Sequence, residues 1–201
     1  MLTQAIGEVL PAAMAVTLSP FPIIAIVLLL AAPGARANGI LFTLGWMGGL
    51  SALTALTLAI SQGTDSADGT SATWVDWARV AGGALMILLG IKKWRTRPRA
   101  GDDVPMPKWM KGFDNVSPRK ALTLGFLLAA ANIKNVALVG SAAASITDLV
   151  AGGHDAFLGA AVFVVLSSAS VLAAVVYSLV AGERATAPLE SVKQFMLANN
   201  A

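Results

Sequence analysis

The sequence contains no cysteine among its 201 residues. This absence excludes disulfide bonds, thiolate metal sites and thiol nucleophiles, but it leaves the cellular compartment undecided. Histidine is nearly absent as well, since the single one, His154, lies beside Asp155 in a Gly-rich stretch typical of a solvated turn. The apolar stretches hold no Ser/His/Asp set, paired carboxylates or metal cluster. We therefore expect a protein that is not an enzyme and needs no cofactor.

Charge is scarce too. Only 12% of the residues are charged, against about 25% in soluble globular domains, whereas 56% are hydrophobic and the mean hydropathy is +0.73. This balance predicts a membrane protein that crosses the lipid bilayer several times.

Five apolar stretches approach or exceed the roughly 20 residues that a membrane-spanning helix needs. They cover residues 6–32, 40–60, 74–91, 121–150 and 156–181. In the second stretch, Gly45 and Gly49 have the spacing that lets helices approach closely. Residues 188–201 resemble the lead-in to a sixth span that is missing or lies beyond this chain. The alternative is a five-span protein with an amphipathic tail on the membrane surface.

The segment between Lys92 and Lys120 is strongly basic. It holds nine of the fourteen Lys and Arg residues against three Asp residues, and nine minus three gives a net charge of +6. Under the positive-inside rule this linker is cytoplasmic and the N-terminus lies outside. The linker could also bind anionic lipid headgroups or dock a cytoplasmic enzyme, although topology alone explains the charge. Because the basic residues gather in one linker, we expect no nucleic-acid partner.

Polar residues interrupt two of the apolar stretches. The first is interrupted by Ser19-Pro20-Phe21-Pro22, where the prolines remove backbone donors and predict a kinked or broken helix. The fourth is interrupted by Asn132-Ile133-Lys134-Asn135, which places Lys134 more than ten residues from either end. A lysine at that depth costs at least ~2.5 kcal/mol, so we expect it to face the protein interior and meet a partner. A bundle lysine with no substrate is the alternative.

The two interruptions have the same place in two halves of the chain. A shift of 113 residues places Ser19 on Asn132, Phe21 on Lys134 and Pro22 on Asn135. The halves, residues 1–91 and 121–201, are joined by the linker 92–120 and enter the membrane from opposite sides. Two inverted three-helix repeats (3+3) in an all-α polytopic membrane protein, each with a broken first helix, indicate a secondary transporter with a midplane site.

These residues also carry a resemblance to a known family. Ser19-Pro20-Phe21-Pro22 followed by Ile23-Ile24-Ala25-Ile26 resembles the opening helix of the lysine exporter (LysE) superfamily. Within it the nearest match is the GAP family of glycopeptidolipid- and sulfolipid-addressing proteins, whose Asn-Pro-Lys-Asn is similar to Asn132-Ile133-Lys134-Asn135, with Ile133 in place of the proline. The resemblance covers essentially the whole chain. It implies export across the plasma membrane, and for the GAP family it implies cell-envelope lipids or glycolipids.

The deep polar residues favour an anionic substrate. No carboxylate occurs among them, which argues against a divalent cation. Our hypothesis is that Lys134 binds an anionic head group and that Asn132 and Asn135 orient it. Ser19, Pro20 and Pro22 complete the predicted site.

Three functions remain open from the sequence. The first is export of an anionic or amphipathic lipid, and the second is export of amino acids or other small solutes. The third is a non-transporting membrane scaffold that recruits a lipid-synthesising enzyme. A homodimer is a further assembly that we consider.

Overall fold

The structure is a computed structural model that describes residues 2–64, 116–149 and 153–185, together with a few single positions further along the chain. The described residues form helices only, with no strand among them, which confirms the all-α prediction for this part. The helices are α1 (Leu2–Thr17), α2 (Pro20–Leu30), α3 (Ala35–Thr64), α5 (Pro118–Ala130), α6 (Ile133–Leu149), α7 (Gly153–Ser167), α8 (Ala169–Ala181) and the 3-10 helix η2 (Gly182–Ala185). The expected third span, most of the basic linker and most of the C-terminal tail lie outside the described residues.

The first apolar stretch is broken where its prolines predict. Helix α1 ends at Thr17, α2 begins at Pro20, and the two axes differ by 54°. Because neither Pro20 nor Pro22 has a backbone N–H, the hydrogen-bond ladder of α1 cannot continue into α2. The predicted break is confirmed.

The fourth apolar stretch is broken as well, although it contains no proline at this point. Helices α5 and α6 meet at 60° around Ala131 and Asn132. The Oδ1 of Asn132 accepts a hydrogen bond from the backbone N–H of Lys134 at 3.0 Å, which is the bond of an N-cap residue. The asparagine therefore starts a new helix here, so that Ile133 can stand where the GAP family usually has proline.

The fifth apolar stretch differs from the continuous span that we expected over residues 156–181. It forms α7 and α8, which meet at 59° beside Ser168. The Oγ of Ser168 donates to Val164 O at 2.7 Å, and its N–H is shared between Val164 O and Val165 O. Serine back-bonding of this kind bends helices. Hydropathy does not detect it, because a serine changes the mean of an apolar run very little.

Helix α3 packs closely against α5. A Cβ atom added at Gly45 would lie 2.0 Å from Leu122 O, and one at Gly49 would lie 2.7 Å from Phe126 O. Gly125 faces α3 in the same way, 2.1 Å from Phe42 O. The close helix approach predicted from the glycine spacing is thus confirmed, and it fixes α5 against the only long unbroken helix of the described residues.

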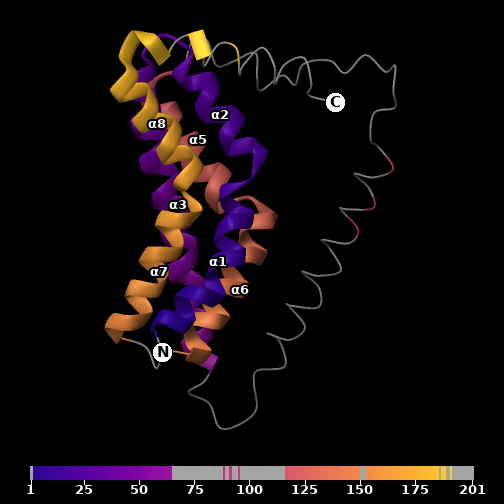
Figure 1. Ribbon diagram of the computed structural model, residues 1–201. Coiled ribbons are helices and arrows are strands. Elements are labelled where there is room, and N and C mark those ends of the chain that lie inside the picture. Colours follow the sequence, from indigo (N-terminus) through magenta and orange to yellow (C-terminus); the bar gives the residue numbers. More distant parts are fainter. Residues whose placement is uncertain are drawn as a thin grey trace.

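The arrangement of the helices divides the molecule into two levels (Figure 1). Helices α1, α6 and α7 lie at one level, α2, α5 and α8 at the other, and α3 runs through both. Within the described residues α3 alone is long and apolar enough to cross a membrane, over Ala35–Ala59. The three bent pairs meet the same criterion when each is joined into one span, which gives up to four crossings. The three breaks lie between the levels.

Candidate functional site

Lys134 lies at the break of the fourth apolar stretch and bonds to the break of the first. It is the second residue of α6, 16 residues beyond Pro118 and 15 before Leu149. Its Nζ donates to Ala15 O at 2.7 Å and to the Oγ of Ser19 at 3.0 Å. At about 1.5 Å per residue the ammonium is more than 20 Å of helix from either end, deeper than half of a ~30 Å hydrocarbon core.

The proline break makes Ala15 O available to this lysine. In a continuous helix the N–H of Ser19 would bond to Ala15 O, but here it bonds to Val16 O at 3.0 Å. The carbonyl of Ala15 therefore lies at the C-terminal end of α1, where the helix dipole favours a cation. The ammonium of Lys134 occupies that position.

The predicted site residues are brought together in part. Ser19 is 2% exposed and bonds directly to Lys134, while Asn132 is half-buried and caps the helix that carries the lysine. Lys134 has met its expected partner, yet its side chain is exposed in the described part of the chain, which differs from our expectation of an interior position. Pro20 is exposed and Pro22 is buried, and both act through the break that they create.

Asn135 points elsewhere. Its side chain is fully buried, and Nδ2 donates to Ala129 O at 3.0 Å and to Leu128 O at 3.4 Å. These carbonyls lie at the end of α5, where a helix leaves acceptors without intrahelical partners. Oδ1 is buried without a hydrogen-bond partner among the described residues. Asn135 thus stabilises the break, and its contact with a substrate stays a prediction.

The sequence did not indicate that the third break joins this cluster. The Oγ1 of Thr17 donates to Leu166 O near the end of α7, and the Oγ of Ser170 in α8 donates to Thr17 O at 2.7 Å. Residues from three apolar stretches therefore satisfy one another beside the break at Ser19. The short run Ser167-Ser168-Ala169-Ser170 was the available signal, but isolated serines are common in membrane helices.

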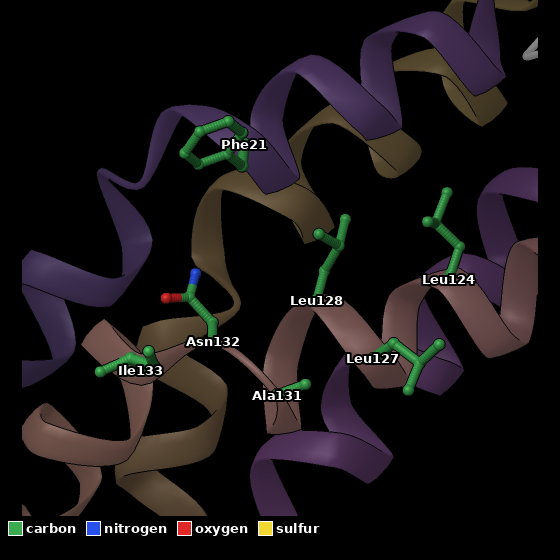
Figure 2. A pocket seen from close by; sticks show the side chains of 7 residues that line it. All are labelled: Phe21, Leu124, Leu127, Leu128, Ala131, Asn132 and Ile133. Atoms are coloured by element: carbon green, nitrogen blue, oxygen red, sulfur yellow. The ribbon is translucent and has the colours of Figure 1, made fainter. Parts of the chain in front are cut away.

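An apolar groove of about 580 Å³ lies beside the polar cluster. Figure 2 shows Phe21 of α2 facing Leu124 and Leu128 of α5, with the amide of Asn132 at the end of the groove. The remaining lining residues are Leu127, Ala131 and Ile133. Hydropathy could not predict this groove, because it depends on how α2 and α5 diverge from their breaks.

The apolar helices, their breaks and the lysine between them define an all-helical membrane protein with a polar cluster midway along its bent helices. No group of three or more potential metal ligands gathers among the described residues. The chain belongs to the SfLAP family, described as Sap, sulfolipid-1-addressing protein, whose profile matches residues 9–201. Comparison with curated proteins and with solved structures gives no match.

This family assignment confirms the resemblance to the sulfolipid-addressing proteins of the GAP family. The name points to a membrane protein concerned with a sulfolipid. Membership in the wider lysine exporter superfamily stays a prediction.

Proposed function

We propose that this protein is a multi-pass plasma-membrane exporter that moves an anionic amphipathic lipid outward through the polar cluster around Lys134. It is not an enzyme in this proposal and uses no cofactor. The observation that carries the proposal is the contact of Lys134 with Ala15 and Ser19, because it places a cation where two broken helices meet. An ionisable residue at this depth is costly, and in membrane proteins it commonly serves a substrate path.

The donors of the lysine support an anionic substrate. An ammonium has three N–H donors, and two of them bond to Ala15 O and Ser19 Oγ in the described residues. The third donor, with the N-terminus of α6 beside it, suits a sulfate, phosphate or carboxylate. An anion that binds there would compete with the carbonyl of Ala15 for the ammonium.

The positions of the first two breaks support inverted repeats. Helices α1 and α5 end at Thr17 and Ala130, and 130 minus 17 is 113; helices α2 and α6 begin at Pro20 and Ile133, and 133 minus 20 is also 113. Packing follows the same exchange, since α1 packs against α7 and α5 packs against α3. Repeats of this kind commonly hold a transport site at their interface.

The distribution of charge supports the proposed orientation. Arg36, Arg119, Lys120 and Arg184 all lie at the end of the molecule where α3 and α5 begin and α8 ends, whereas Asp155 lies at the start of α7 at the other end (Figure 1). Under the positive-inside rule the basic end is cytoplasmic, which leaves the N-terminus outside. The basic linker 92–120 begins and ends on that same cytoplasmic side in this proposal.

A deletion strain tests the proposed function. Surface lipids, medium solutes and the cell-associated pool are extracted separately from cells that lack the gene and from cells rescued with the wild-type chain. We expect one anionic surface lipid to fall on deletion, to accumulate inside, and to return with the wild-type chain.

Two other results would contradict lipid export. A changed pool of amino acids or other small solutes in the medium, with surface lipids intact, would favour a small-solute exporter. Loss of the lipid in a variant with a neutralised linker, together with full function of Lys134→Met, would favour a scaffold that docks a cytoplasmic enzyme.

A further inference from the structure

We infer that the apolar groove between α2 and α5 holds an acyl chain of the exported lipid while its anionic head lies at Lys134 and Asn132. This inference rests on the proposed function and assigns separate residues to the two ends of the substrate. The groove has about 580 Å³, within the roughly 300–1,000 Å³ typical of small-molecule sites. Six of its seven lining residues are Phe, Leu, Ile or Ala, so its ligand must present an apolar surface.

The groove and the polar cluster share a wall. Asn132 lines the groove, and its Oδ1 accepts the backbone N–H of Lys134. Phe21, on the opposite wall, lies two residues after Ser19, which binds the ammonium of Lys134 (Figure 2). A molecule whose charged head bonds to Lys134 can therefore extend an apolar chain directly along α5.

The groove is open on its side. Leu127 is 51% exposed, Phe21 43% and Ile133 41%, although all three line it. In a bilayer such a surface meets lipid chains rather than water. A lipid can thus bring its chain in from the membrane without leaving an apolar medium.

The physical chemistry favours this division of labour. Moving a chain from the bilayer to an apolar groove gains little, because lipid tails are as apolar as leucine. Affinity then depends on the head group, whose charge-assisted hydrogen bonds are strong at that depth. A small polar solute would leave the groove unfilled. An amphipathic anion fits both the groove and the polar cluster.

Photolabelling of the full-length protein tests the groove. The purified protein in detergent is mixed with a phosphatidylglycerol that carries a diazirine in one acyl chain, irradiated, digested and mapped by mass spectrometry. We expect adducts concentrated in the segment 124–133, and about tenfold fewer of them when a phosphatidylcholine with the same chain replaces the anionic probe. Equal labelling by the two probes would overturn the link between groove and lysine.

Substitutions separate the groove from the exposed surface. Leu128→Trp and Leu124→Trp fill the groove, and Leu56→Trp, on an exposed position of α3 that is 59% exposed, is the matched control. We expect the two groove variants that remain monodisperse to lose labelling in 124–133 and to export less lipid in cells, while the control keeps both. Unchanged labelling or unchanged export in the groove variants would overturn the inference.

The two proposals fail in different ways. If the groove is not the chain site, labelling is scattered over exposed helix faces while Lys134-dependent lipid export persists in cells. If the exporter proposal itself is wrong, the gene deletion leaves surface lipids unchanged whatever the labelling shows.

Discussion

The ammonium of Lys134 lies 3.0 Å from the hydroxyl oxygen of Ser19 and thereby connects the breaks of two apolar stretches that are far apart in the sequence. The contact has a consequence for both partners. Ser19 is almost fully buried and bonds through this lysine, and the lysine relies on Ser19 and Ala15 to offset its removal from water.

A double-mutant cycle measures this coupling. We expect Ser19→Ala to destabilise the purified protein by about 1–3 kcal/mol, because it removes a hydrogen bond to a charged group. In a Lys134→Met background the same serine substitution should have little effect, since its partner is gone. The measurement is thermal unfolding in detergent, and additive effects of the two substitutions would contradict the contact.

Asn132 allows the helix cap to be separated from the charge of the site. Asn132→Ala should destabilise the protein by about 1 kcal/mol through loss of the cap, whereas Asn132→Ser and Asn132→Asp keep a capping oxygen. Asn132→Asp also places a carboxylate beside Lys134, so we expect it to keep stability yet reduce export of an anionic lipid. Normal export by the Asp variant, measured as surface lipid, would argue against an anionic substrate at this position.

The contact between α3 and α5 predicts a difference between neighbouring glycines. Gly45→Ala should destabilise by about 1–3 kcal/mol, because its new Cβ would overlap Leu122 O. Gly48 has no atom within 4 Å of an added Cβ, so Gly48→Ala serves as the control and should be neutral or mildly stabilising. Equal unfolding midpoints for the two variants would contradict the close approach of the helices.

Ser170 tests whether the third break belongs to the cluster. Its hydroxyl donates to Thr17 O, so Ser170→Ala should cost about 1 kcal/mol of stability. Ser141→Ala, at an exposed position of α6, is the matched control. If both alanine variants unfold at the same temperature, the bond between α8 and the end of α1 does not contribute.

The sequence predicts the breaks best where the chemistry is local. Pro20 and Pro22 remove donors wherever they stand, and a lysine in the middle of an apolar run requires a partner, so both features could be identified without a structure. The 113-residue offset gave the corresponding position in the other half. The family resemblance, carried by the same residues, also agreed with the family profile.

The remaining features depend on three-dimensional packing. The acceptor for Lys134 includes a backbone carbonyl, Ala15 O, and no side-chain pattern reveals which carbonyl a break sets free. The bend at Ser168 and the contacts of Thr17 depend on hydroxyl groups that can bond within their own helix or outside it. Asn135 was assigned to a substrate, but it bonds to the end of α5, because its direction on α6 could not be inferred from spacing alone.

The most direct test of the account is the rate at which a newly made anionic lipid reaches the cell surface. Cells that carry the wild-type chain, Lys134→Met or Lys134→Arg are pulse-labelled, and surface lipid is extracted over time at matched protein levels. We predict a rate about tenfold lower or less for Lys134→Met, because a charge-assisted bond to the head group is lost, and a partial rate for Lys134→Arg, which keeps the charge. A wild-type rate in the Lys134→Met cells would contradict the central claim that this lysine binds the exported lipid.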